Sequence, residues 1–295
     1  MKLGLNIRNF GPAATPDNLR AWARFAEDTG FAVVMMSDHV APTPDVQAIY
    51  PTPFYDPFTT LSWLAAQTRT LELGTSVTVL PYRNPLLTAR VAANLDQFSG
   101  GRFILGVGVG WSKPEYDALG VPFERRGAIT DEYLDVIRAF WANDRISADG
   151  RHVSFRDVST APRPVRTPPI WVGGTSPGAI RRAARYGDAW HPNNAGMSWL
   201  RDEGLPALRA AAEAAGRPVP EFSPRFQIQL TDHHVSADDR PVGTGTLAQI
   251  RADLDELATL GCAYVVLDTN PDAPDDPRPV TEDFGVLERV ARSVT

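Results

Sequence analysis

The sequence predicts an α/β fold, namely a (β/α)8 TIM barrel formed by a single domain over residues 1–295. Short apolar runs alternate with longer segments of helical periodicity from one end of the chain to the other. Eight such runs can be counted. Eight parallel strands with helical crossovers close most economically as a barrel, whereas an open doubly wound sheet usually stops at about five to seven strands.

The first half of the chain follows this alternation closely. Strands are predicted at residues 3–7, 33–36, 71–77 and 102–109. The run 33–36 is apolar without alternation, as in a strand that is buried on both faces. Helices with apolar residues at helical spacing are predicted from Pro16, at about 58–69 and at about 85–98.

The alternation breaks after the fourth strand and later resumes. Residues 111–168 are predicted to form an insertion between strands four and five, with an amphipathic helix at 132–141 and a hairpin-like stretch at Asp149-Gly150. The remaining strands are predicted at 170–174, 188–191, 226–230 and 264–268, separated by helices at 177–186, 199–215 and 245–260.

Composition and charge exclude several classes of function. The chain has 29 basic and 35 acidic residues and no basic block that would neutralise a run of phosphates, so we expect no nucleic-acid partner. No segment approaches the roughly 20 apolar residues that cross a bilayer, and the N-terminal residues lack the apolar region of a signal peptide. The single cysteine, Cys262, excludes a disulfide within the chain. We expect a cytoplasmic protein that acts on a small molecule and forms a homodimer.

The carboxyl ends of the strands are where barrels of this kind carry their chemistry. Asp38-His39 ends the second strand and is followed by a long Pro-rich segment, residues 40–57, which is typical of a lid over the barrel mouth. A histidine at the start of this lid can donate or accept a proton near neutral pH. The alternative is that Asp38 and His39 only cap and anchor the lid.

Two glycine-rich segments follow later strands. Gly106, Gly108 and Gly110 leave a strip of wall without side chains, against which a flat ring system can lie, and Trp111 borders the same space. The segment Gly173-Gly174-Thr175-Ser176 precedes a helix that begins near Pro177, which predicts a phosphate site at a helix N-terminus. Ser176 alone as an N-cap is the alternative there.

A metal-dependent hydrolase is a further possibility, since several histidines and acids lie near strand ends: His39, His191, His233, His234, Asp38 and Asp268. Barrel hydrolases of that class typically begin with a His-x-His pair on strand one. Here strand one offers Asn6-Ile7-Arg8 instead, so we expect no metal.

Taken in order, these motifs resemble the luciferase-like monooxygenase superfamily, and in particular its coenzyme F420-dependent branch. The resemblance spans nearly the whole chain and rests on ordered segments that include Ser37-Asp38-His39-Val40, Leu73-Gly74-Thr75-Ser76-Val77, Asn84-Pro85, Ser99-Gly100-Gly101-Arg102, Leu105-Gly106-Val107-Gly108-Val109-Gly110-Trp111, Pro169-Ile170-Trp171-Val172-Gly173-Gly174 and Ala184-Arg185-Tyr186-Gly187-Asp188.

The resemblance implies a tricyclic deazaflavin, coenzyme F420, across the barrel mouth. It implies a cis peptide at Ser76-Val77, where members of the branch press on the central ring. His39 would be the proton donor. The cofactor contacts that it implies are Asp38, Ser76 and Val77 at the ring, Val109 and Gly110 through their backbone, and Gly174, Thr175 and Ser176 at the phosphate.

The chain departs from the sugar-phosphate dehydrogenase of that branch at one position, where Trp111 replaces the acid that follows the glycine run. We therefore expect a more apolar substrate, with Tyr82, Trp111 and Trp190 as candidate wall residues or, alternatively, as ordinary core. The leading hypothesis is an F420-dependent oxidoreductase that transfers a hydride. Its alternatives are an FMN-dependent monooxygenase with a partner reductase and, less favoured, a flavin-binding protein without catalysis.

Overall fold

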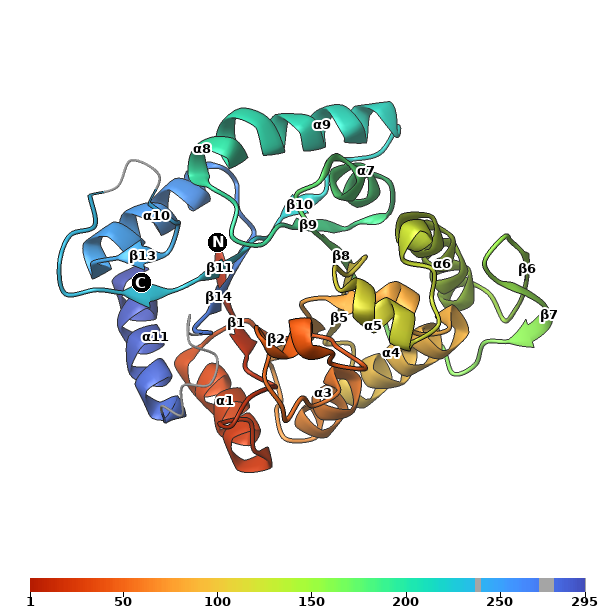
Figure 1. Cartoon of the computed structure of the whole chain (residues 1–295), viewed down its shortest axis with the longest axis horizontal. Helices are drawn as coiled ribbons and strands as arrows, with labels where there is room; N and C mark the ends of the chain where they lie inside the picture. Colours follow the sequence, from red (N-terminus) through yellow and green to blue (C-terminus); the bar gives the residue numbers. More distant parts are fainter. Residues whose placement is uncertain (237–239, 271–278, 295) are drawn as a thin grey trace.

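The centre of the computed structural model, which describes residues 1–236, 240–270 and 279–294, is a parallel sheet that curls on itself inside a ring of helices (Figure 1). The strands follow the order β10-β9-β8-β5-β3-β2-β1-β14-β11, with β4 paired to β5. Their bounds are β1 (Lys2–Ile7), β2 (Val33–Met36), β3 (Glu72–Thr75), β4 (Thr78–Val79), β5 (Phe103–Gly108), β8 (Ile170–Gly173), β9 (Ala189–His191), β10 (Glu221–Phe222), β11 (Arg225–Gln227) and β14 (Tyr264–Asp268).

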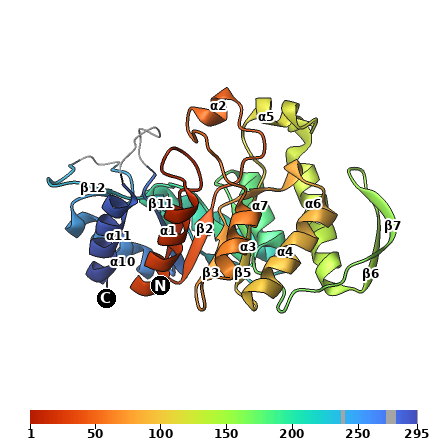
Figure 2. The same ribbon diagram turned by 90° about the horizontal axis from the view of Figure 1, so that it is seen from below.

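Helices cover the outer side of this sheet. They are α1 (Pro16–Thr29), α3 (Pro57–Ala65), α4 (Pro85–Ser99), α6 (Arg126–Ala142), α7 (Pro177–Tyr186), α9 (Leu205–Ala214), α10 (Leu247–Thr259) and α11 (Val280–Val294). Short helices α2 (Pro44–Gln47) and α5 (Lys113–Ala118) lie together at one end of the sheet, and both chain termini lie at the other end (Figure 2). The end that carries α2 and α5 is the end to which the parallel strands point.

Two short strands lie just before and at the start of the predicted seventh strand, and they pair with different neighbours. β10 pairs with β9, whereas β11 pairs with β14. Two isolated bridges add to this pairing. Asn193, just after β9, pairs with Arg225 of β11, and Phe222 of β10 pairs with Cys262, just before β14. Residues 221–227 thus lie between the two edges of the curled sheet. The prediction of a strand at 226–230 was wrong in its bounds, because residues 229–230 instead form β12 (Gln229–Leu230), which pairs with β13 (Thr244–Gly245).

The predicted third strand, residues 71–77, ends earlier in the structure, at Thr75, and a second short strand follows it. β3 and β4 are separated by Ser76 and Val77, and the peptide bond between these two residues is cis. The cis peptide confirms what the family resemblance implied for this position. Ser76 and Val77 follow the carboxyl end of β3, which lies between β2 and β5 in the sheet.

The segment 111–168 contains more of the regular alternation than the sequence predicted. Its long helix α6 packs against α4 and α7, as a crossover helix between β5 and β8 must. The additional elements are α5 before this helix and, after it, an antiparallel hairpin of β6 (Arg145–Asp149) and β7 (Ser154–Ser159). The hairpin projects from one side of the molecule (Figure 2).

Side chains alternate between the two faces of each strand and so build two cores. The outer core packs strands against helices, and Trp190 belongs to it. The inner core fills the curled sheet with Val33, Met35, Ile104, Trp171, Ala189, Tyr264 and Val266. The free thiol of Cys262 is buried, and burial raises its pKa to about 12.

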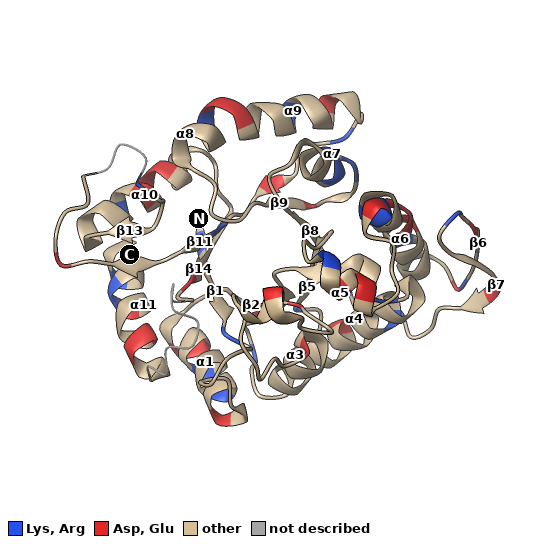
Figure 3. Cartoon of the chain, viewed as in Figure 1, with Lys and Arg blue, Asp and Glu red and all other residues tan. Residues whose placement is uncertain are grey.

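Charged residues lie mainly on the outer helices, where acidic and basic groups are interspersed (Figure 3). In the described part of the chain no helix is long and apolar enough to span a membrane.

Close packing between β3 and β5 predicts that Gly106 cannot be replaced. A Cβ atom there would lie 1.7 Å from the carbonyl oxygen of Thr75, which is backbone and cannot move aside. Gly106→Ala should lower the free energy of unfolding by at least about 2 kcal/mol. Gly285→Ala is the matched control, because its Cβ would meet no atom within 4 Å in α11 and should raise stability by about 0.5–1 kcal/mol. Equal urea-unfolding midpoints for the two variants would contradict this account.

Candidate active site

A cavity of about 280 Å3 lies at the carboxyl ends of the strands, beneath the lid. It is lined by predicted site residues from four separate parts of the chain: Asp38, His39, Ser76, Val77, Val109, Gly110, Trp111, Gly174 and Ser176. Ser37, Tyr50, His191, Asn193 and Arg225 also line it. Predictions based on strand ends therefore converge on one place, whereas Thr175, Tyr82 and Trp190 do not line this cavity.

The side chain of Asp38 is held by two neighbouring segments. Its carboxylate accepts two hydrogen bonds from the Arg83 guanidinium, at 2.6 and 2.7 Å, and a third from the backbone N–H of Val79 at 2.9 Å. Burial raises the pKa of Asp38, and the ion pair with Arg83 opposes this rise. The interaction fixes the end of β2 against β4, and Arg83 continues to Asp56 at the N-terminus of α3.

His39 lies against a buried carboxylate that the sequence analysis did not identify. Its Nδ1 atom is 2.6 Å from Oε2 of Glu115, a residue of α5 with no solvent exposure. The other carboxylate oxygen, Oε1, accepts hydrogen bonds from the backbone N–H groups of Val40 at 2.8 Å and Ala41 at 2.9 Å. Glu115 therefore connects α5 both to His39 and to the start of the lid.

Glu115 was missed because its contact partners are distant in sequence. Ser112-Lys113-Pro114-Glu115 has the spacing of a capping box, which by itself predicts only the start of a helix. Half of that box is present, since the Ser112 hydroxyl accepts from the N–H of Glu115 at 3.2 Å. The Glu115 side chain instead reaches the lid.

The floor of the cavity is a polar network around Ser76. Its hydroxyl lies 2.9 Å from Nε2 of His191, and Nη1 of Arg225 donates to the Ser76 carbonyl at 2.9 Å and to its hydroxyl at 3.2 Å. Arg225 also forms a buried ion pair with Asp268. Because Nδ1 of His191 contacts the Ser223 carbonyl, which can only accept, Nδ1 carries the proton and Nε2 accepts from Ser76.

This network keeps His191 uncharged. Burial, with a contribution from the positive charge of Arg225, lowers the pKa of His191 to about 4. A second histidine at the cavity is thus a fixed hydrogen-bond acceptor, and His39 is the histidine with a carboxylate partner.

One wall of the cavity carries no side chains and faces Val77. A Cβ atom at Gly108 would lie 2.6 Å from Cγ2 of Val77, and one at Gly173 would lie 3.1 Å from Cγ1. Gly110 and Gly174 have φ angles of +66° and +103°, which favour glycine. Gly106 does not line the cavity, so of the three glycines predicted to form this wall only Gly108 and Gly110 take part.

The predicted phosphate loop is accessible at the edge of the cavity. Gly174, Thr175 and Ser176 are exposed, directly before α7. The Ser176 hydroxyl accepts from the N–H of Ala179 at 3.2 Å, so the N-cap is present. An N-cap does not prevent an anion from binding at this helix end.

Two of the three aromatic residues proposed as walls are placed elsewhere. Trp190 lies between Ala189 and His191 on β9, and because neighbouring residues face opposite sides it points to the helices, where it packs on Trp199 and Phe222. Tyr82 is buried outside the cavity and donates to Glu115 at 3.0 Å. Trp111 does line the cavity, is 46% exposed, and meets His39 edge to face at 6.0 Å.

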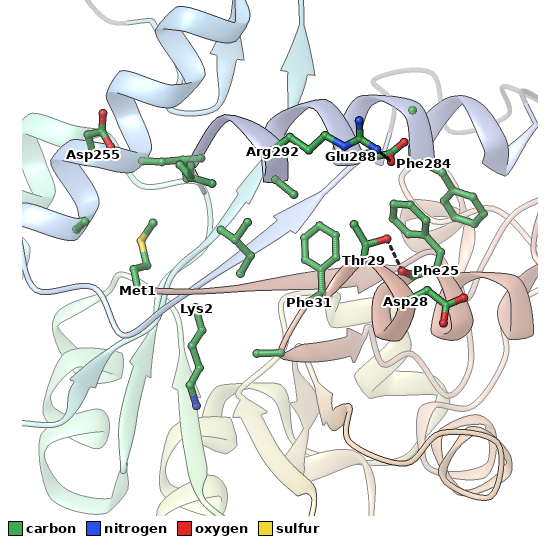
Figure 4. A pocket seen from close by; sticks show the side chains of 18 of the residues that line it. Met1, Lys2, Phe25, Asp28, Thr29, Phe31, Asp255, Phe284, Glu288 and Arg292 are labelled. Atoms are coloured by element: carbon green, nitrogen blue, oxygen red, sulfur yellow. Dashed lines mark hydrogen bonds and ion pairs between the residues drawn. The ribbon is translucent and has the colours of Figure 1, made fainter.

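A larger cavity, of about 1040 Å3, opens at the opposite end of the sheet between α1, α10 and α11 (Figure 4). Phe25, Phe31 and Phe284 line it together with Asp28 and Arg292. It lies at the amino ends of β1 and β2, away from all the predicted site residues. His233 and His234 are exposed and line neither cavity, and among the described residues no three His, Cys, Asp or Glu side chains are grouped as a metal site requires.

The model of the luciferase-like monooxygenase family matches residues 1–260. The chain belongs to this family. It is 33% identical over 221 residues to an F420-dependent glucose-6-phosphate dehydrogenase of Kineococcus radiotolerans, which covers 73% of this chain and 64% of that protein. It is 32% identical over 220 residues to an F420-dependent hydroxymycolic acid dehydrogenase of Mycobacterium tuberculosis, covering 72% and 58%. The chain thus matches less than two thirds of the length of either relative.

Two solved structures share the fold. A monooxygenase from Streptomyces bottropensis superposes with a TM-score of 0.82 at 22% identity, covering 100% of this chain and 98% of that one. An F420-dependent secondary alcohol dehydrogenase gives 0.81 at 18% identity, covering 100% and 99%. At these identities the likeness supports the curled parallel sheet and its helices.

The buried neutral state of His191 predicts a pH dependence of stability. Since its pKa is about 4 in the folded chain and about 6.5 when unfolded, the unfolded chain binds a proton more readily. Stability should therefore be lost as the pH falls from about 6.5 towards 4. In His191→Asn, whose amide can still donate to Ser223, the melting temperature should fall less steeply over this range than in the wild type. The exposed His234→Asn variant should keep the wild-type slope, and parallel curves for all three proteins would contradict the assignment.

Proposed function

We propose that this chain is an oxidoreductase that binds coenzyme F420 and transfers a hydride between the deazaflavin and an organic substrate. The observation that carries the proposal is the cavity in which a wall without side chains faces Val77, with His39 at the same cavity. A flat ring needs such a wall, and a hydride transfer that creates or consumes a hydroxyl group needs a proton carrier.

The residues present fit this cofactor. Gly108, Gly110 and Gly173 line the cavity with backbone alone, and the missing Cβ atoms let Val77 and Val79 pack closely beside them. The exposed loop Gly174-Thr175-Ser176 would hold the phosphate at the N-terminus of α7. Asp38, Ser76 and Val109 line the same cavity and would complete the contacts with the ring. When bound, the deazaflavin supplies the hydride donor or acceptor.

His39 would carry the proton. Oxidation of an alcohol removes a hydride from carbon and releases the hydroxyl proton, and reduction of a carbonyl needs that proton back. The Nδ1 atom of His39 is committed to Glu115, so Nε2 is the nitrogen left for the substrate. The same histidine serves both directions of the reaction.

The substrate would be neutral and fairly apolar. Tyr50, Trp111 and Phe54 surround His39, with ring centroids 5.2, 6.0 and 5.5 Å from the imidazole. Arg225 is the one cationic side chain among the described residues that line the cavity, and Asp268 already neutralises it. A sugar phosphate would find no unpaired cation on these lining residues, which argues against the substrate named for the Kineococcus relative.

We also propose that the chain forms one closed barrel domain and assembles as a homodimer. The pairing of residues 221–227 with both β9 and β14 supports a closed (β/α)8 barrel in one domain.

Leu87, Val91 and Phe98 lie along one side of α4, with Leu87 55% and Phe98 69% exposed. Such an apolar stripe supports a homodimer. We further propose a cytoplasmic location.

Cofactor titration of the apoprotein tests the central proposal. We expect coenzyme F420 to bind with a dissociation constant in the micromolar range or tighter, and FMN to bind much more weakly, because of the cradle formed by Val77 and the glycine wall. Ring absorbance and fluorescence report both equilibria. Preference for FMN would instead favour the monooxygenase with a partner reductase.

A matched pair of variants tests the phosphate site in the same titration. Asp and Asn are both good N-caps, so Ser176→Asp and Ser176→Asn should preserve α7 and the melting temperature. Only aspartate places a negative charge beside the phosphate, and it should weaken F420 binding at least about tenfold more than asparagine does. Equal affinities would show that the phosphate lies elsewhere.

Replacement of His39 tests its role in proton transfer. General acid–base groups usually contribute about 10²–10⁴-fold to rate, so His39→Asn should lower kcat with secondary alcohols or ketones by at least about tenfold. The dissociation constant for F420 and the melting temperature should remain near wild-type values. Normal turnover would remove His39 from the mechanism, whereas joint loss of binding and stability would identify it as an anchor of the lid.

A further inference from the structure

We propose that Glu115 is a positioning residue that fixes the tautomer of His39, so that Nδ1 carries the proton and Nε2 is the reactive nitrogen in the cavity. The inference rests on the proposed function of His39, but the tautomer itself can be measured without cofactor or substrate. Glu115 is fully buried and is not among the residues that line the cavity, so it can act there only through His39.

The hydrogen bonds around the carboxylate define which atoms are donors. Oε1 accepts from two backbone N–H groups, those of Val40 and Ala41, and a backbone N–H can only donate. Oε2 accepts a hydrogen bond from the hydroxyl of Tyr82 at 3.0 Å and lies 2.6 Å from Nδ1 of His39. The carboxylate therefore has four close partners, and each of them can be a donor.

Four donors stabilise the ionised form of Glu115. Burial alone would raise the pKa of this carboxyl, but the hydrogen bonds from His39, Ala41 and Val40 outweigh burial and hold it below its usual value. An ionised carboxylate has no proton to give, so the hydrogen between Oε2 and Nδ1 belongs to the imidazole. Neutral His39 is then the Nδ1–H tautomer, with a lone pair on Nε2.

This arrangement fixes which nitrogen of His39 exchanges a proton with the substrate. Nε2 accepts the hydroxyl proton of an alcohol, and the resulting imidazolium keeps its Nδ1–H bond to the carboxylate, which stabilises the new positive charge. In the reverse direction the imidazolium returns this proton from Nε2 to the carbonyl oxygen. Tyr82, proposed from sequence as a substrate wall, instead supports the carboxylate.

Glu115→Gln makes a specific prediction about the tautomer. The amide oxygen of glutamine is its only acceptor there, and the N–H groups of Val40 and Ala41 require it. The amide NH2 then faces His39 and donates to Nδ1, which leaves the proton on Nε2. We therefore expect Nδ1–H in the wild type and Nε2–H in Glu115→Gln.

The measurement is 15N NMR of the apoprotein labelled at histidine, recorded at about pH 9, where ordinary histidines are neutral. His39→Asn identifies the His39 resonances by their disappearance. Glu115→Asp retains a carboxylate and should keep the Nδ1–H form, even where its shorter side chain lowers activity. Asp45→Asn is the matched control, because Asp45 accepts from Ser112 at 2.7 Å and joins the same two segments without touching His39. It should leave the tautomer and kcat unchanged.

Activity provides a second readout. Glu115→Gln should lower kcat by at least about tenfold with little change in F420 affinity, as is usual when the partner of a catalytic histidine is altered. An Nε2–H wild type, or the same tautomer in wild type and Glu115→Gln, would overturn the inference. If Glu115→Gln fails to fold, the wild-type and Glu115→Asp spectra still decide it. If F420 does not bind at all while the tautomers follow this pattern, the proposed function fails and the role of Glu115 stands.

Discussion

The inner face of the curled sheet has room for few side chains, and this limit shapes both the core and the cavity. At the level of Met35, large residues fill the interior because the adjacent strand carries glycine, and a Cβ at Gly74 would lie 2.8 Å from Cε of Met35. Closer to the carboxyl ends, Gly108 and Gly173 face Val77, and the space beside them is the cavity. One residue type thus admits a dense core at one level and borders the cavity at the next.

Buried charges around the cavity occur in pairs that join separate elements. Arg83 binds Asp38, Arg225 binds Asp268, and Glu115 faces His39. Removing charges from water is costly, so each pair is held in a narrow geometry by its own hydrogen bonds. Their value to the protein is therefore orientation more than stability. Groups that face a ligand are already aligned before it arrives, which is what electrostatic catalysis requires.

Local patterns are enough to predict most of the strands, the helices and the strand ends that form the cavity. They are not enough where a role depends on which face of a strand a side chain occupies, or on contacts between residues far apart in the sequence. Trp190 and His191 are neighbours on β9, yet only His191 faces inward. Glu115 is 76 positions from His39, and Arg225 is 149 positions from Ser76. No single-chain pattern predicts such pairs, because the curled sheet itself brings them together.

The anchors of the lid also affect the entropy of binding. Val40 and Ala41 are tied to Glu115 at its start, while Tyr55 exchanges hydrogen bonds with Asn9 near its end. The stretch between these points is held as well, since Asp45 accepts from Ser112 and the carbonyl groups of Pro51 and Pro53 accept from Gly11, and a segment anchored along its length has fewer conformations to lose. Ordering the lid over a bound molecule therefore costs less free energy than ordering a loop attached only at its ends, and more of the contact energy is left for affinity.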